Sequence, residues 1–166
     1  MIKVTVKHSV MPRIHGSLLL LAGIENNRFK ERQVINIKSL VQNKIAELDE
    51  SIRSKALNVD LDLEEERVGM DPQLADLLMD KLLGNAIRHT DQEGSIRIIS
   101  LERLLFICNS GQHPLNKEQL FNRLYPPEVP RKPGLGLAIA RQICDEHGFA
   151  LDYDYKEGQH LFFINF

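Results

Sequence analysis

The sequence lacks several features that whole classes of function require. Tryptophan is absent, 6% of the 166 residues are aromatic, and the formal net charge is -2. Nucleic-acid binding needs a basic surface and, for single strands, aromatic rings on which bases stack, so the composition argues against a nucleic-acid partner. A membrane-spanning helix needs ~20 consecutive apolar residues. The longest apolar run, Ser17–Ile24, is too short for that role.

Cysteine is also scarce. Cys108 and Cys144 are far apart and both lie among apolar residues, a pattern typical of buried free thiols in a reducing compartment. No CxxC pair suggests a metal site, and the N-terminus lacks the basic start, apolar run and cleavage site of a signal peptide. We therefore expect a soluble, cytoplasmic chain.

Strand and helix patterns follow one another from residue 30 onward. Ser39 is the expected cap of the first helix, and Asp71 and Pro72 are the expected cap and first residue of the second. A sheet of mostly antiparallel strands, covered on one face by helices, fits this order. The predicted strands span residues 34–37, 58–66, 95–101, 104–108, 150–155 and 160–166, and the predicted helices span residues 39–57, 71–90, 118–125 and 135–147.

The first 29 residues have a different character. Leu18–Leu21 is apolar on all sides, which suits a helix that packs against a partner. The following stretch, Glu25–Arg32, has the composition of a polar linker. We therefore place a boundary between residues 1–29 and residues 30–166.

The predicted helix that ends near Thr90 has an apolar stripe and a polar stripe. The apolar stripe comprises Leu78, Leu82, Leu83 and Ala86, and the polar stripe comprises Lys81, Asn85, Arg88 and His89. An amide in the middle of such a helix is costly unless it is satisfied. Asn85 could bond to backbone at the edge of the core. Alternatively, its oxygen could ligate a hard cation such as Mg²⁺, whose coordination shell substrate phosphates would complete.

Two shorter motifs admit a structural and a functional interpretation. Gly134 and Gly136 precede a helix, where exposed backbone amides favour an anion such as phosphate, although glycines also occur there for packing reasons. Asn109–Gly111 follows a predicted buried strand that ends at Cys108. This stretch is either a simple turn or a cup whose amide hydrogen-bonds the edge of a base.

In their order and spacing, these motifs resemble the ATP-binding catalytic domain of sensor histidine kinases, in the GHKL ATPase superfamily. The resemblance covers about residues 30–166. It implies an α/β two-layer sandwich, with a mixed sheet and helices packed on one face, preceded by a remnant of a dimerisation helix. The matching boxes are the N box at Asn85–Thr90, the G1 box at Asn109–Gly111, the F box at Leu120–Tyr125 and the G2 box at Gly134–Ile143.

The resemblance implies a role for each matched residue, with ATP and Mg²⁺ as cofactors. Asn85 would coordinate Mg²⁺ between the phosphates, Arg88 would contact phosphate, and His89 would lie beside the nucleotide. Asn109 would accept a hydrogen bond from the adenine amino group. The remaining implied nucleotide contacts are Lys81, Gly111, Tyr125, Gly134, Leu135, Gly136 and Leu137.

Some residues depart from the family pattern. Asn109 stands where the family usually has Asp, and its neutral oxygen would form a bond weaker by about 1–2 kcal/mol. Lys81 stands where many relatives have Asn, and Lys132 and Pro133 replace small residues that usually begin the G2 box. Pro126–Pro133 takes the place of the ATP lid.

No histidine here has the sequence context of a phosphoacceptor. We expect residues 1–24 to be the remnant of the second helix of a dimerisation hairpin, which makes the chain a fragment whose full-length protein is anchored in the membrane. The implied partners are the phosphoacceptor hairpin of the same kinase, a response regulator and a second copy through residues 1–24. The alternatives are a degenerate domain that acts as a docking or phosphotransfer scaffold and another superfamily ATPase, such as an anti-sigma-factor kinase.

Overall fold

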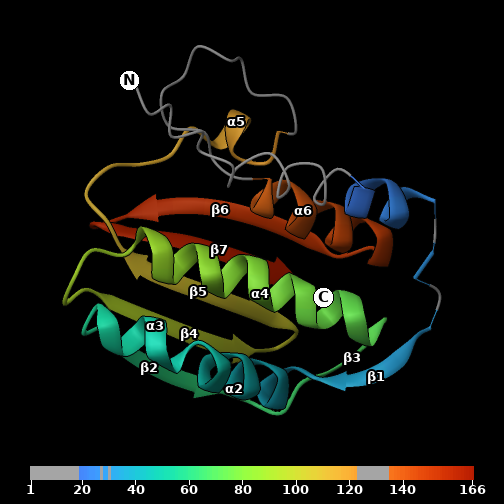
Figure 1. Cartoon of the computed structure of the whole chain (residues 1–166), viewed down its shortest axis with the longest axis horizontal. Coiled ribbons are helices and arrows are strands. Elements are labelled where there is room, and N and C mark those ends of the chain that lie inside the picture. The colour runs from blue at the N-terminus through green and yellow to red at the C-terminus, as the bar shows by residue number, and fades with distance from the viewer. Residues whose placement is uncertain (1–18, 27, 30, 123–134) are drawn as a thin grey trace, which may run out of the picture.

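The computed structural model describes residues 19–26, 28–29, 31–122 and 135–166. It is an α/β two-layer sandwich in which helices cover one face of a mixed sheet, as the sequence predicts. Figure 1 shows the central helix α4 lying across the sheet between α2 and α6. No helix of the described residues is long and apolar enough to cross a membrane.

The main sheet has five strands in the order β2-β4-β5-β7-β6. The pair β2–β4 is parallel and the other pairs are antiparallel. A separate antiparallel pair, β1–β3, forms a small second sheet. The strands are β1 Gln33–Asn36, β2 Asn58–Leu63, β3 Arg67–Met70, β4 Ser95–Leu101, β5 Leu104–Ser110, β6 Ala150–Lys156 and β7 Gln159–Asn165.

The helices match the predicted ones with some shifts at their ends. They are α2 Ile37–Glu47, α3 Asp49–Ser54, α4 Pro72–His89, α5 Lys117–Leu120 and α6 Gly136–His147. The structure divides the first predicted helix into α2 and α3 at Leu48. The predicted helix over residues 118–125 is shorter in the structure, because α5 ends at Leu120 with Phe121 as its C-cap. Residues 123–125 lie outside the described chain.

Helix α4 begins and ends where its sequence predicts. The side chain of Asp71 accepts hydrogen bonds from the N–H groups of Gln73 and Leu74, and Pro72 occupies the first turn. At the other end, the N–H and hydroxyl of Thr90 both donate to the carbonyl of Ala86. The predicted apolar stripe is buried: Leu78, Leu82, Leu83 and Ala86 are each at most 3% exposed.

Two predictions near the start of the domain are wrong. Asn36, and not Ser39, caps α2, because the Asn36 side chain accepts from the N–H of Ser39 and the helix already begins at Ile37. Strand β3 has no counterpart in the prediction. Its four residues alternate between exposed and buried, and they become a strand only by pairing with β1.

The predicted end of β5 at Cys108 is also wrong. The strand continues through Asn109 and Ser110, which pair with His160 and Gln159 of β7. The pairing with β7 satisfies the backbone and outweighs the turn preference of this local sequence. The side chain of Asn109 is thereby held on the sheet, and the chain leaves the sheet only at Gly111.

The leucine-rich segment before the domain is not uniformly exposed. Residues 19–25 are helical, and Leu21 and Ile24 are each 2% exposed and belong to the core, whereas Leu19 is 74% exposed. Leu21 and Ile24 therefore pack against the core of this chain itself. The contact of residues 1–24 with a second copy stays a prediction. The boundary at residue 29 stays a prediction.

The two cysteines are free thiols, as expected, but only Cys144 is fully buried. Burial raises the pKa of the Cys144 thiol to about 12, which makes it unreactive at neutral pH. Cys108 is half-buried on the sheet face opposite the helices.

Candidate functional site

A row of side chains crosses the helix-covered face of the sheet near the C-terminal end of α4. Asn109 of β5 lies between Ile96 of β4 and His160 of β7, and Tyr155 of β6 follows His160. Side chains of directly paired residues project from the same face of a sheet. The row therefore lies under the end of α4 that carries Arg88 and His89.

Asn109 holds the least satisfied polar atom of the row. The residue is 1% exposed, and its Oδ1 has no hydrogen-bond partner in the part of the chain that the structure describes. Its Nδ2 donates to the carbonyl oxygen of Ser110 at 3.4 Å. A buried acceptor without a donor costs about 1–3 kcal/mol. A ligand that donates a hydrogen bond to Oδ1 would recover that cost.

The backbone carbonyl of Ser110 determines which end of the Asn109 side-chain amide faces a ligand. If the amide were flipped, its oxygen would face the carbonyl oxygen of Ser110 and the two acceptors would repel. The observed orientation therefore offers an acceptor, as an aspartate would, to whatever approaches Asn109. An amino group such as that of adenine is a suitable donor.

Gly111 packs directly against the imidazole of His160. A Cβ added at Gly111 would overlap the ring atoms Nε2 and Cδ2 of His160. The resemblance explains this glycine by the close approach of a base. The structure supplies a second reason, because the histidine ring already fills the space that a side chain would need.

His160 is held by a network of hydrogen bonds and aromatic contacts. Its Nδ1 lies 2.9 Å from the hydroxyl of Tyr153, which accepts from the N–H of Leu115 at 3.0 Å. The ring centroid of Tyr155 lies 5.1 Å from that of His160, and the Tyr155 hydroxyl donates to the carbonyl of Gly111. Burial lowers the pKa of the His160 imidazole.

The polar stripe of α4 runs from the start of α6 to the row on the sheet. Lys81 lies at the α6 end, where a Cβ added at Gly136 would be 3.6 Å from Lys81 Cδ. Asn85 is half-buried, and Arg88 and His89 are exposed. The predicted stripe is thus a continuous surface that borders both α6 and the end of β5.

Asn85 makes no side-chain hydrogen bond with another residue that the structure describes. The alternative in which its amide bonds to backbone at the edge of the core therefore finds no partner there. No described residue therefore occupies its oxygen. The described chain contains no group of three or more His, Cys, Asp or Glu side chains that could hold a metal ion. A cation at Asn85 would therefore need oxygens from the nucleotide.

The start of α6 offers backbone amides. Leu135 is its N-cap and contributes no capping side chain, so the amides of the first turn are not satisfied by their own cap. Such a helix start favours an anion. Leu137 is 4% exposed and packs in the core, so it can contact a ligand only through its backbone. Tyr125 and Gly134 lie outside the described residues.

His89 lies in a positively charged surrounding. Partial burial lowers the pKa of its imidazole, and the nearby charges of Arg88, Lys55 and His160 lower it further. Cationic groups that lie close together repel one another, and such a cluster suits an anionic ligand.

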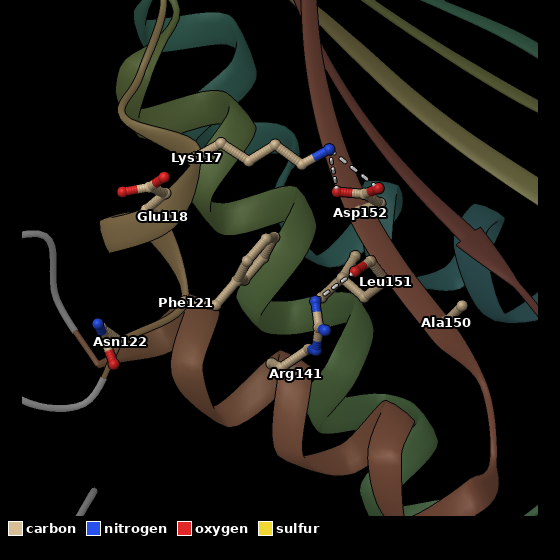
Figure 2. A pocket seen from close by; sticks show the side chains of 8 residues that line it. All are labelled: Lys117, Glu118, Phe121, Asn122, Arg141, Ala150, Leu151 and Asp152. Carbon is tan, nitrogen blue, oxygen red and sulfur yellow. Dashed lines mark hydrogen bonds and ion pairs between the residues drawn. The ribbon is translucent and has the colours of Figure 1, made fainter.

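A cavity of about 590 Å³ opens elsewhere, between α5, α6 and β6 (Figure 2). Lys117 pairs with Asp152 at its rim, and Arg141 donates to the carbonyl of Leu151. The Arg141 guanidinium also lies 5.2 Å from the ring centroid of Phe121, in the stretch that resembles the F box. None of the predicted nucleotide contacts that the structure describes lines this cavity.

Comparison with known proteins agrees with this arrangement. Sensor histidine protein kinase HK06 of Streptococcus pneumoniae is 26% identical over 156 residues, and heme sensor protein HssS of Staphylococcus aureus is 30% identical over 142 residues. The matches cover 87% and 78% of this chain. The catalytic domain of histidine kinase ThkA superposes with a TM-score of 0.70 at 26% identity, covering 81% of this chain and 93% of that domain.

The relatives of this chain are sensor histidine kinases, and its fold is that of a histidine kinase catalytic domain. No protein-family model matches its sequence. The chain also shares its fold with the histidine kinase AdeS of Acinetobacter baumannii, with a TM-score of 0.74 at 22% identity over 93% of this chain and 77% of AdeS. It spans about a third of the length of its curated relatives, 34% of HK06 and 30% of HssS.

One related structure includes a partner. Histidine kinase ThkA has been solved in complex with the response regulator protein TrrA. The chain superposes on the ThkA of that complex with a TM-score of 0.65 at 24% identity, covering 99% of this chain and 52% of ThkA.

Two residues of the site were not predicted from the sequence. His160 was only the first residue of the predicted strand 160–166, and Lys55 fell within the predicted helix 39–57 without being singled out. The alternation could have placed His160 on the buried face. Its pairing with Asn109 depends on strand register, which the sequence pattern does not provide.

Proposed function

We propose that this kinase domain binds Mg-ATP beside Asn109, Asn85 and the start of α6, and supplies the γ-phosphate to a histidine on a dimerisation hairpin. The observation that carries the proposal is the buried Oδ1 of Asn109, which has no hydrogen-bond partner among the described residues. The family resemblance assigns this residue to the adenine amino group. The adenine amino group would give this oxygen the donor that it lacks. A guanine, which presents an oxygen at that point, would repel it.

The phosphates would lie along α4 and reach the start of α6. The amides at that helix start and the charge of Arg88 suit a triphosphate, and Lys81 lies beside Gly136 at the same place. Asn85 would hold Mg²⁺ through its oxygen. The ion would neutralise charge on the phosphates during transfer. The protein's own contribution is positioning and charge stabilisation, because a neutral imidazole acceptor is already a nucleophile.

The phosphoacceptor hairpin and a response regulator are the partners of this proposal. The complex of ThkA with TrrA supports a response regulator as partner of a related kinase. We assign the domain to the cytoplasmic side of a membrane-anchored sensor, in keeping with its similarity to sensor kinases.

Calorimetric titration with ATP, with and without Mg²⁺, tests the proposal. The parent chain should bind ATP, and Mg²⁺ should tighten binding. Asn85→Ala should remove the effect of Mg²⁺ and leave adenosine binding unchanged, because adenosine has no phosphates. Asn43→Ala, which removes an exposed amide from the unrelated helix α2, is the matched control and should bind as the parent does.

The outcomes separate the alternatives. A parent chain that binds no ATP would favour the docking or phosphotransfer scaffold. An Asn85→Ala chain that keeps its response to Mg²⁺ would remove Asn85 from the metal site. Transfer of labelled γ-phosphate to a hairpin supplied in trans then tests the kinase step itself.

A further inference from the structure

Lys55 binds the C-terminal end of α4 from a different helix. It directly follows α3, and its Nζ donates hydrogen bonds to the carbonyl oxygens of Ile87 at 2.9 Å, Arg88 at 2.8 Å and Thr90 at 2.9 Å. A lysine ammonium has three N–H donors. All of them therefore point at the backbone of the turn that carries Arg88 and His89.

The backbone of Lys55 contacts the loop between α4 and β4. Its carbonyl accepts from the N–H of Glu93 at 2.8 Å. Gly94 is packed so closely that a Cβ there would press on Thr90 and on the hydroxyl of Ser110. That hydroxyl also accepts from the N–H of Ser95 at 3.1 Å. Lys55 is thus connected to both sides of the site, the end of α4 and the strand end beside Asn109.

The charge of Lys55 offsets a repulsion that a triphosphate would otherwise meet in the proposed site. The last carbonyls of a helix have no partners within it, and they give the C-terminus a partial negative charge. Arg88 and His89 lie at this end of α4, so a triphosphate that reached them would meet a repulsive helix end. An ammonium that binds those carbonyls removes the unpaired acceptors and offsets their charge.

We infer that Lys55 is a positioning residue for the triphosphate, which it serves by fixing and neutralising the end of α4. The inference rests on the proposed nucleotide site. Lys55 lies behind the turn and acts through Arg88 and His89. The charge of Lys55 contributes to lowering the pKa of His89, so the ammonium lies near that imidazole.

The test compares Lys55→Met with Lys44→Met. Lys44 is a matched control because it is also a lysine that links two helices, α2 and α4, through Glu47 and Asp76. It is 4% exposed and lies away from the C-terminal turn of α4. Both changes should lower the urea midpoint of unfolding. Lys55→Met alone should raise the Kd for ATP, by about tenfold.

Adenosine separates positioning from simple loss of structure. Adenosine contacts the Asn109 side of the site and has no phosphates, so its Kd should change less than about twofold in Lys55→Met. Lys55→Arg keeps the charge and several donors, and it should restore most of the ATP affinity. If Lys55→Met does not fold, Lys55→Gln, which is neutral but keeps two N–H donors, takes its place.

Two results would overturn the inference. One is equal loss of ATP and adenosine binding in the neutral Lys55 variants, which would mean a structural role only. The other is unchanged ATP binding in those variants while the parent binds ATP. A parent that binds no ATP at all would instead refute the proposed function on which the inference rests.

Discussion

At the scale of single residues, the buried side-chain oxygen of Asn109 lowers the stability of the ligand-free protein. Its oxygen is buried and has no partner among the described residues, whereas its amide nitrogen donates to the carbonyl of Ser110. Such an acceptor lowers the stability of the ligand-free chain. It strengthens binding when a ligand supplies the missing donor. In the proposed site, the departure from the family's usual aspartate would therefore change the strength of the contact with adenine and leave its direction intact.

Asn109→Asp should tighten ATP binding by roughly tenfold, because a charged acceptor forms a hydrogen bond stronger by about 1–2 kcal/mol. The same change should destabilise the free chain, since the carboxylate would be buried and close to the carbonyl of Ser110. Calorimetry and urea unfolding measure the two effects.

Asn109→Leu is the matched control for that substitution. It removes the unpaired acceptor in a side chain of similar shape, so it should keep or raise stability and weaken adenosine and ATP alike. Unchanged or weaker ATP binding in the aspartate variant would contradict the assignment of Asn109 to the adenine amino group.

At the scale of secondary-structure elements, the site depends on how the ends of β5 and β7 fit together. Asn109 and Ser110 stay on the sheet because β7 pairs with them. Immediately beyond, the ring of His160 fills the space beside Gly111. The two strand ends form one packed unit, and neither can change shape without the other.

Gly111→Ala should destabilise the chain by about 1–3 kcal/mol, because the added methyl overlaps the imidazole of His160. His160→Ala removes that ring, so the double variant should be more stable than the sum of the two single effects predicts. A double-mutant cycle by urea unfolding measures the coupling, which should be about 1 kcal/mol or more.

Additive effects in that cycle would show that Gly111 is required for another reason. The close approach of a base, which the family resemblance implies, would then be the remaining explanation. Nucleotide titration of the Gly111→Ala and double variants would distinguish the two, because only a base requirement keeps the defect after His160 is removed.

At the scale of the whole molecule, the histidines of the site link stability to pH. Burial lowers the pKa of His160, and partial burial together with neighbouring cations lowers the pKa of His89. Both have a lower pKa in the folded chain than the ordinary value of 6.5. The unfolded chain therefore binds more protons as the pH falls, which favours unfolding.

The free energy of unfolding should thus be highest above about pH 6.5 and should decrease as the pH falls through that value. Urea unfolding between roughly pH 8 and pH 6 measures this slope. His89→Gln should make the slope shallower, whereas His113→Gln, at an exposed position outside the network, should leave it as in the parent. A slope that is the same in all three chains would contradict the role of His89.

The sequence by itself determined the local elements and the chemistry of α4. The spacing of apolar residues, the cap Asp71 and the first proline predicted this helix and its polar stripe, because helical periodicity and capping are local properties. The family resemblance then supplied roles for Asn85 and Asn109, which the structure brings to the same side of the sheet.

The tertiary structure alone decided which residues complete the site. The extension of β5 to Ser110, the contact of Gly111 with His160 and the binding of Lys55 to the end of α4 all join segments that are distant in sequence. A local pattern specifies which face of an element is buried, but it carries no strand register and no partner helix. Those depend on packing of the whole chain, which is why Asn109 became a buried acceptor on a strand instead of a residue in a turn.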